Sequence, residues 1–441
     1  MNATNARLDG LRLLLIGCTI FMLFGAIAGS TTPVSMLDFK SLYYGSRCLV
    51  SGCDPFEQSD VLRLYRSEGG ENASDTPKSV RITTEYGNLP TTVVFVVPFA
   101  MLPWGPAHAV WMAFIGASFV LAALLMWNLG AEYAPLMSGG MIFVLLAGSE
   151  ILLLTGNAAG IVVSFTIVAA WCFLQNRFVW AGVLCLAVGL AIKPHDSGLV
   201  WLYFLLAGGV YRRRALQSLL AAVAIGLPAV LFVWRIAPHW MQELNANLNS
   251  FSSSGDVADP HLASLGIHDL GMLINLQTVL SFFWNHPIFY NTVSYLVGGA
   301  LILVWMLVVL RSRPSMANSL LALAAIAPLS MLPIYHRAYD AKLLLIAVPA
   351  CAMLWIKGGL IGRLAFASTT AGFVFTGDLM PAVLLGIASK LHASTAGGAG
   401  QIMTALQVVA APLSLLAMGV FYLCVYARQA RTSIASAGVS L

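Results

Sequence analysis

The sequence AHAVWMAFIGASFVLAALLMWN, residues 107–128, contains no Asp, Glu, Lys or Arg. A helix of this length crosses the roughly 30 Å hydrocarbon core of a bilayer. Similar runs recur along the 441 residues, of which 59% are hydrophobic and only 9% charged. So few charges cannot cover the surface of a soluble protein of this size, and the runs are too long for the strands of a membrane barrel. The sequence therefore predicts an all-α polytopic membrane protein.

The apolar runs predict about twelve transmembrane helices in a single membrane-embedded domain over residues 1–441. The predicted spans are at about 11–30, 107–128, 135–155, 157–175, 178–193, 197–211, 216–236, 288–310, 316–333, 341–356, 364–386 and 403–427. A run over 91–101 is too short for a confident crossing, so we expect it to be re-entrant or to lead into the next helix. A weaker run over 272–284 is expected to lie at the membrane interface.

Basic residues indicate which connections are cytoplasmic, because Lys and Arg are enriched on that side. Arg7 precedes the first span, while Arg177 and the basic run 212–214 separate alternate pairs of later spans. This pattern places both termini in the cytoplasm, with the first span retained and not cleaved as a signal peptide. The remaining predicted regions are a large first external loop (about 31–90), a second external region (about 237–287) and C-terminal helices (about 360–427).

Two of the seven cysteines, Cys48 and Cys53, lie together in the predicted first external loop. A disulfide forms between such residues if the loop faces an oxidising compartment, and two free thiols are an equally good interpretation of the sequence. The other five cysteines lie in apolar runs and are interpreted as packing residues.

Asp38 follows the predicted end of the first span by about eight residues, at the level of the lipid headgroups. A carboxylate that is half shielded from water there tends toward a raised pKa, which suits a general base. The alternative is that Asp38 caps a short juxtamembrane helix running to Gly52, since Asp is a favoured N-cap and Gly a favoured residue after a helix end.

Several short motifs follow one another in a fixed order. They are Asp38-Phe39-x-x-x-Tyr43-Tyr44, Gly52-x-Asp54-Pro55-Phe56, Tyr86-Gly87-Asn88-Leu89-Pro90, Gly156-Asn157, and the run from Ala181-Gly182 to Lys193-Pro194 followed by Arg212 to Arg214. In order, spacing and sidedness, this pattern resembles glycosyltransferase family 87, whose members are GT-C transferases that use polyprenyl-phosphate sugars. The resemblance covers roughly residues 10–350, although the third motif lacks one proline of the family's Tyr-Pro-Pro segment.

The resemblance implies GT-C architecture, with Asp38 as the catalytic base of an inverting transfer. A polyprenyl phosphate is already a good leaving group, so the enzyme needs one base and cations for the departing phosphate. The candidates for phosphate binding are Lys193, His195, His336, Arg337 and Lys342. The motif residues expected to bind substrate are Tyr43, Tyr44, Asp54, Asn88 and Asn157.

Simpler roles exist for the same cations. Arg337 could pair with Asp340, and Lys193 could pair with Asp196 or extend to the membrane interface. The histidines of the second external region lack the close spacing typical of metal ligands, and Asp38 has no neighbouring acidic residue. We therefore expect a metal-independent enzyme without a cofactor.

The sequence thus predicts a glycosyltransferase that moves mannose or arabinofuranose from a polyprenyl-phosphate donor to a glycan or glycolipid acceptor. The expected location is the inner membrane of a bacterium, with the active site on the periplasmic face and membrane lipids as partners. No nucleic acid partner is expected, and no oligomeric state is predicted. The rival interpretation is a flippase or secondary transporter, which should place ionisable residues in mid-membrane and not at one surface.

Overall fold

The computed structural model describes residues 3–31, 36–70, 75–253, 255–261, 273–378 and 398–438. Regular structure in these ranges is helical, and the one β-type contact among them is an isolated bridge between Leu273 and Arg337. The prediction of an all-α protein is confirmed for the part of the chain that the structure describes.

Six helical segments of the described chain are long and apolar enough to cross a bilayer, which supports an integral membrane protein; five lie in single helices, and Pro135–Thr155 combines two shorter ones. These segments are Thr4–Gly29, Trp104–Ala131, Pro135–Thr155, Gly209–Ile236, Pro287–Arg311 and Val408–Arg431. The total of twelve crossings stays a prediction.

A helix lies within each of the twelve predicted spans, although residues 379–386 of one span are outside the described ranges. The elements are α1 (Ala3–Thr31), α6 (Trp104–Ala131), α7 (Pro135–Leu146), α8 (Ile151–Thr155), α9 (Ala159–Gln175), α10 (Val179–Ile192), α11 (Pro194–Ala207), α12 (Gly209–Ile236), α15 (Pro287–Arg311), α16 (Met316–Ser330), the 3₁₀ helix η2 (Asp340–Ala347), α17 (Val348–Lys357), α18 (Gly359–Phe375) and α20 (Gly398–Gly438). Several of these, such as α10 and α11, have only 14 residues.

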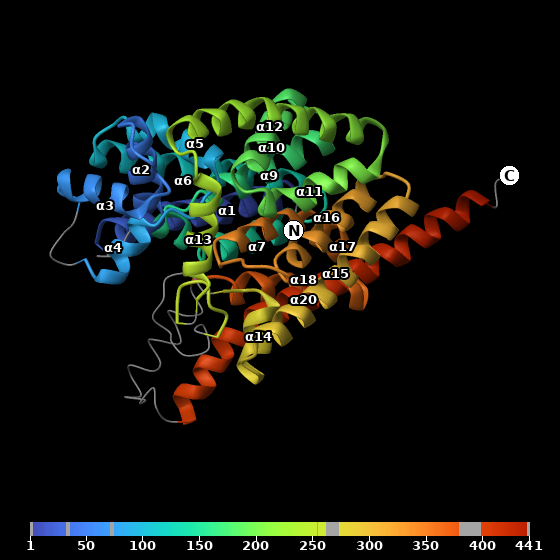
Figure 1. Cartoon of the computed structure of the whole chain (residues 1–441). Coiled ribbons are helices and arrows are strands. Elements are labelled where there is room, and N and C mark those ends of the chain that lie inside the picture. Colours follow the sequence, from blue (N-terminus) through green and yellow to red (C-terminus); the bar gives the residue numbers. More distant parts are fainter. Residues whose placement is uncertain are drawn as a thin grey trace.

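The predicted external regions also form helices. These are α2 (Leu37–Val50), α3 (Gln58–Ser67), α4 (Pro77–Thr84), α5 (Pro90–Ala100), α13 (Trp240–Phe251) and α14 (Leu276–Phe283). Figure 1 shows α2, α3 and α4 grouped at one side of the molecule, far from the C-terminal end of α20. The run predicted as re-entrant or leading into the next helix is α5, a separate helix that ends before Pro103.

The two predicted external regions are joined to each other. The side-chain amide of Asn247 in α13 donates hydrogen bonds to the backbone carbonyls of Phe56 and Tyr86, at 3.0 and 2.9 Å. Arg81 of α4 forms an ion pair with Asp256. The structure also contains a disulfide between Cys48 and Cys53. Of the two interpretations of the sequence, a disulfide or two free thiols, it has the disulfide.

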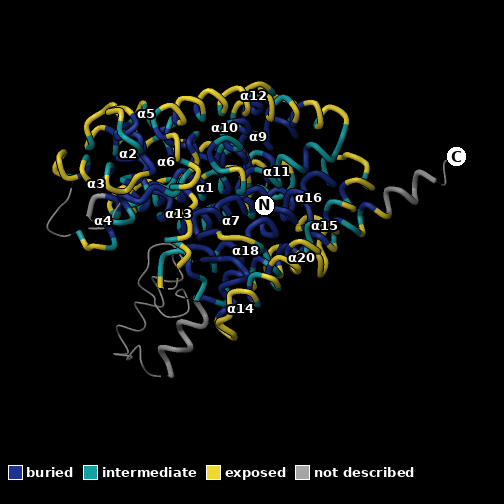
Figure 2. The backbone as a smooth tube through the Cα atoms, viewed as in Figure 1, coloured by how far each residue is buried: buried dark blue, intermediate teal, exposed yellow. Residues whose placement is uncertain are grey.

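Burial follows the expectation for a bundle in lipid. Figure 2 shows α9 as mostly buried, whereas α12 is exposed along much of its length. The exposed side chains of α12 and α15 include large apolar ones, such as Leu220 and Leu296. Apolar residues on the outside of a bundle are what a bilayer solvates, so these two helices present lipid-compatible surfaces.

Candidate active site

Asp38 lies in the first turn of α2 and is half buried. The side-chain amide of Asn157 donates a hydrogen bond of 2.9 Å to its Oδ2 atom. The other end of the Asn157 amide accepts a hydrogen bond from the backbone N–H of Ala159, also at 2.9 Å. Because Oδ1 of Asn157 is engaged in this way, its NH₂ group is the end that faces Asp38. The carboxylate is therefore held in a defined orientation.

The short helix that the sequence suggested as an alternative does exist, but Asp38 does not cap it. Met36 occupies the N-cap position in a left-handed conformation, and its backbone N–H donates to the carbonyl of Leu154 at 2.6 Å. The helix ends at Val50, and Gly52 follows with a φ of +79°. The side chain of Asp38 is consequently free of a capping role and is directed toward Asn157.

Gly156 allows this approach of α2 to α8. Its φ is +65°, and a Cβ atom there would lie 2.8 Å from both the sulfur of Met36 and the Cβ of Phe39. Its carbonyl accepts a 2.7 Å hydrogen bond from the indole of Trp111. The glycine thus serves two needs at once, a left-handed backbone and close helix packing.

Lys193, at the junction of α10 and α11, bridges two buried carboxylates. Its Nζ atom is 2.9 Å from Oδ1 of Asp340 and 3.3 Å from Oδ2 of Asp196. Both carboxylate side chains are 1% exposed. The alternative in which Lys193 pairs with Asp196 is therefore present in the structure, together with a second partner from η2.

Two histidines face the other oxygen of Asp196. The Nε2 atom of His336 is 3.4 Å from Oδ1 of Asp196, and Nε2 of His195 is 3.6 Å from the same atom. Burial acts to lower the pKa of His336, but Asp196 and Asp340 outweigh it and raise this pKa. Partial burial lowers the pKa of His195. The three side chains form a group with the atoms and spacing of metal ligands.

Sequence reasoning missed this group for a physical reason. Spacing along one helix does not bring these side chains together, because His336 approaches His195 and Asp196 from a segment about 140 residues further along the chain. The only usable signal was that both segments are predicted to reach the same membrane surface. Metal independence stays a prediction.

Arg337 is buried beside the same network. Its guanidinium donates to the hydroxyl of Tyr335 and to the backbone carbonyl of Val257, each at 2.6 Å. Burial opposes its charge, yet the neighbouring Tyr335, Tyr339 and Asp38 outweigh this and raise the pKa of Arg337 above its usual value. The charges of Arg337 and Asp38 therefore interact.

The alternative of an Arg337–Asp340 pair takes a different form from the one expected. Oδ2 of Asp340 accepts the backbone N–H of Arg337 at 2.8 Å, and the charge partner of Asp340 in the structure is Lys193. The guanidinium of Arg337 is directed to Tyr335 and Val257 instead.

Lys342 does not join the other predicted phosphate-binding cations. Its Nζ atom donates to the carbonyls of Gly148 and Thr376, at 2.5 and 3.3 Å, and the residue is fully buried. The carboxylate of Asp378, which lies near Lys342, accepts the backbone N–H of Ile151 at 2.7 Å. These contacts stabilise the break between α7 and α8, and they argue against a phosphate contact for Lys342.

Two of the predicted substrate-binding residues are buried, and the other three are half buried. Tyr43 and Tyr44 are buried in an aromatic cluster with Trp104, and the Tyr43 hydroxyl donates to the carbonyl of Leu102. Asn88 is half buried in the connection between α4 and α5. The two tyrosines thus support α2, and Asn157 is the member of the set that contacts Asp38.

Asp54 faces α13 and not Asp38. It accepts the backbone N–H of Phe56 at 2.9 Å. Burial raises its pKa. Burial and the adjacent charge of Asp54 also raise the pKa of Glu243 in α13 to about 6. Asp54 thus belongs to the contact between the two predicted external regions.

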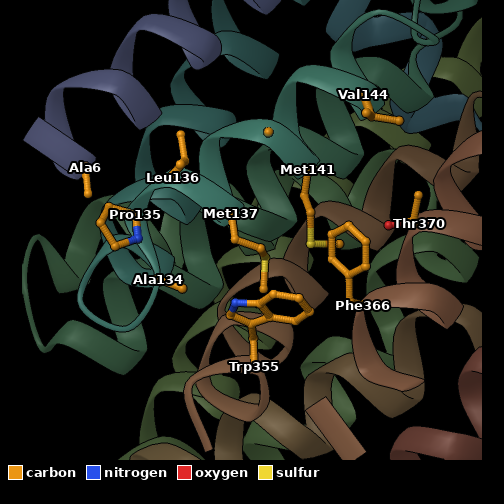
Figure 3. A pocket seen from close by; sticks show the side chains of 11 residues that line it. Ala6, Ala134, Pro135, Leu136, Met137, Met141, Val144, Trp355, Phe366 and Thr370 are labelled. Carbon is orange, nitrogen blue, oxygen red and sulfur yellow. The ribbon is translucent and has the colours of Figure 1, made fainter. Parts of the chain in front are cut away.

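An apolar cavity of about 570 Å³ lies between α7, α17 and α18, away from these charges. Figure 3 shows Trp355 and Phe366 facing Met137 and Met141 across it. None of the predicted site residues lines this cavity, so it has no part in the charged site.

A comparison with protein-family models matches the glycosyltransferase family 87 model to residues 88–333, more than half of the chain. The chain belongs to glycosyltransferase family 87. The suspected family is thereby confirmed, and the protein is a membrane glycosyltransferase. The matched residues of this family 87 chain include Asn157 and Lys193, whereas Asp38 precedes them and His336 follows them. No curated protein and no solved structure matches the chain.

Proposed function

We propose that this family 87 protein transfers a sugar from a polyprenyl-phosphate donor to a glycan or glycolipid acceptor, with Asp38 as general base. The observation that carries the proposal is the setting of Asp38. Its carboxylate is half buried, is oriented by the 2.9 Å hydrogen bond from Asn157, and interacts with the charge of Arg337. A fixed carboxylate beside a cation suits a base that works next to a bound phosphate.

In the proposed reaction, an acceptor hydroxyl attacks the anomeric carbon as the bond to the donor phosphate breaks. Asp38 takes the hydroxyl proton, and the electron pair of the broken bond leaves on the phosphate. A single displacement of this kind inverts the anomeric configuration. The donor sugar is proposed to be mannose or arabinofuranose, and the proton transfer uses no cofactor.

Arg337, whose guanidinium also donates to Tyr335 and Val257, is one candidate cation for the departing phosphate. Its charge interacts with that of Asp38, and a guanidinium binds phosphate through two parallel hydrogen bonds. Lys193 and His336 already face the carboxylates of Asp340 and Asp196. Lys193 and His336 would therefore bind the phosphate while they remain paired with these two carboxylates.

The site is proposed to face the periplasm of a bacterium, with both termini in the cytoplasm and GT-C architecture. Two observations support this sidedness. The distribution of Lys and Arg predicts that the loop containing Asp38 is external. The disulfide between Cys48 and Cys53 in the same loop is typical of an oxidising compartment.

The test is to incubate the purified full-length protein with polyprenyl-phosphate mannose, arabinofuranose and glucose and a mixture of envelope glycolipids. We expect transfer from one polyprenyl-phosphate sugar and an inverted anomeric signal in the product. Transfer from nucleotide sugars alone would contradict the proposed donor. Movement of a lipid-linked glycan across proteoliposomes without bond cleavage would favour a flippase instead.

A further inference from the structure

The apolar cavity between α7, α17 and α18 is separate from the charged site, and its depth matches one leaflet of a bilayer. Figure 3 shows Ala6 and Pro135 at one end of the cavity and Val144 at the other. Pro135 is the first residue of α7, and Val144 is close to the last one. At about 1.5 Å per residue, the helix rises about 13.5 Å between them. This distance is nearly half of the roughly 30 Å hydrocarbon core.

The cavity opens at the surface of the molecule and has a mainly apolar lining. Leu136, Trp355 and Phe366 line it and are 37, 41 and 37% exposed. Of the described residues that line it, Trp355 and Thr370 carry a nitrogen or oxygen atom in the side chain. A cavity with so few polar groups suits a hydrocarbon chain better than water. Because it is open, such a chain can enter from the bilayer.

Three basic residues belong to the segments around the Pro135 end of the cavity. They are Arg7, Lys357 and Arg363, each within three residues of a side chain that lines the cavity. Arg363 precedes Phe366 by about one turn of α18, so the two side chains share a helix face. All three basic residues are exposed, and none of them takes part in an ion pair among the described residues.

The net charge at this end stays positive when its acidic residues are counted. Glu132 follows the last residue of α6, close in sequence to the lining residue Ala134. Asp9 is already paired with Arg12 at 2.9 Å. Three cations and the carboxylate of Glu132 give 3 − 1 = +2. The distribution of Lys and Arg predicts that this end faces the cytoplasm. Basic pockets between transmembrane helices on that side bind anionic lipid headgroups.

We propose that this cavity binds one acyl chain of an anionic phospholipid from the cytoplasmic leaflet, with the headgroup phosphate held by Arg7, Lys357 and Arg363. An apolar cavity one leaflet deep with a basic end fits a hydrocarbon chain joined to a phosphodiester, as in phosphatidylglycerol. The predicted topology places Asp38 at the opposite surface of the membrane. Lipid binding here is therefore independent of the proposed transfer reaction, and its failure would leave the role of Asp38 unaffected.

The position of the lipid is tested with phosphatidylglycerol that carries a photoreactive diazirine in one acyl chain. It is added to delipidated full-length protein in a neutral detergent, irradiated, and the adducts are located by mass spectrometry of peptides. We expect adducts on the lining residues of α7 and α18, and we expect unlabelled phosphatidylglycerol to compete better than phosphatidylcholine. Adducts confined to α12 and α15, whose exposed surfaces are lipid-compatible, would overturn the site.

The headgroup contact is tested by measuring the dissociation constant of phosphatidylglycerol by native mass spectrometry. Lys357→Gln and Arg363→Gln should each weaken binding by about 5-fold, and the double variant by about 25-fold. Arg213→Gln is the matched control, because it removes an exposed cation from another predicted cytoplasmic connection. It should bind as the parent does. Equal losses in Arg213→Gln and Arg363→Gln would overturn the headgroup contact, since any basic surface would then serve.

The chain-binding part is tested by Gly140→Leu, which fills part of the cavity. The heavy atom nearest to a Cβ at Gly140 is Cδ1 of Leu13, at 3.9 Å, and leucine favours a helix over glycine. The variant should therefore fold, which thermal unfolding without lipid checks. We expect phosphatidylglycerol binding to weaken by about 10-fold or more, because several methylene groups lose their apolar surroundings. Unchanged binding and labelling, or tighter binding of polyprenyl phosphate than of phosphatidylglycerol by the parent, would contradict the proposed ligand.

Discussion

At the scale of single residues, Asp38 owes its orientation to Asn157, whose amide is fixed at both ends. We expect Asn157→Asp to place a second carboxylate against the first. Like charges at this distance raise a carboxyl pKa. The acid limb of the pH profile of transfer should therefore move up by about one pH unit or more. Measuring kcat between about pH 5 and about pH 8 checks this. An unchanged pH profile would show that residue 157 does not influence the ionisation of the general base.

The sequence predicted the residues of the site better than their partners. Asp38, Asn157 and Lys193 belong to the sequence motifs, and His336 and Arg337 are charged residues predicted at the outer membrane surface; their roles in the reaction stay predictions. The pairing of each carboxylate with a particular cation depends on packing between distant segments. The spacing of residues in the sequence does not predict this packing.

Lys342 is the clearest case of a residue whose contacts could not be predicted from the sequence. It lies two residues after Asp340 in the sequence, but the tight turns of η2 direct it to the carbonyls of Gly148 and Thr376. Asp340, in the same element, pairs with Lys193 instead.

At the scale of elements, the packing of α2 on α8 depends on Gly156. Gly156→Ala should destabilise the protein by about 1 to 2 kcal/mol from the left-handed backbone alone. The contact of the new Cβ with Met36 and Phe39 adds to this. Transfer should fall as well, because α2 carries Asp38. Thermal unfolding and transfer rate are measured together.

The matched control for Gly156→Ala is Gly105→Ala. Gly105 lies in the first turn of α6, and a Cβ atom there meets nothing within 4 Å. Alanine should be neutral or slightly stabilising at that position. Equal effects of the two substitutions would show that close packing at Gly156 is not needed.

The contact of α13 with the first external loop should depend on pH through Glu243. Its pKa is raised from 4.5 to about 6 in the folded protein, so folding favours its protonated form. The associated stability is present below the unfolded pKa and is lost as the pH rises through about 6. We expect the melting temperature to fall over this range, and Glu243→Gln to flatten the fall. If the melting temperature of Glu243→Gln falls with pH as steeply as that of the parent, groups other than Glu243 cause the pH dependence.

At the scale of the whole molecule, the helices were predictable because each apolar run is a local property of the chain. The structure places a helix in every predicted span. The helical nature of the first external loop was not predicted in full, since α3 and α4 depend on contacts with α2 and α13 as well as on their own sequence.

The predicted sidedness can be tested with impermeant thiol labelling of single-cysteine variants that lack the free thiols. Gln58→Cys and Met241→Cys replace exposed residues of the two predicted external regions, whereas Arg213→Cys lies in a predicted cytoplasmic connection. In intact cells the first two should react and the third should react only after the membrane is permeabilised. Reaction of Gln58→Cys and Arg213→Cys from the same side would contradict the topology.

The most direct test of the central claim is single-turnover transfer by Asp38→Asn, measured with donor binding to the same protein. Asparagine preserves the shape of the side chain but cannot accept the proton. We predict normal folding, donor affinity within a few-fold of the parent, and a transfer rate that falls by about 10²-fold or more. Asp9→Asn, which changes an exposed carboxylate paired with Arg12, should retain full activity. Parent-like transfer by folded Asp38→Asn would contradict the assignment of Asp38 as the base.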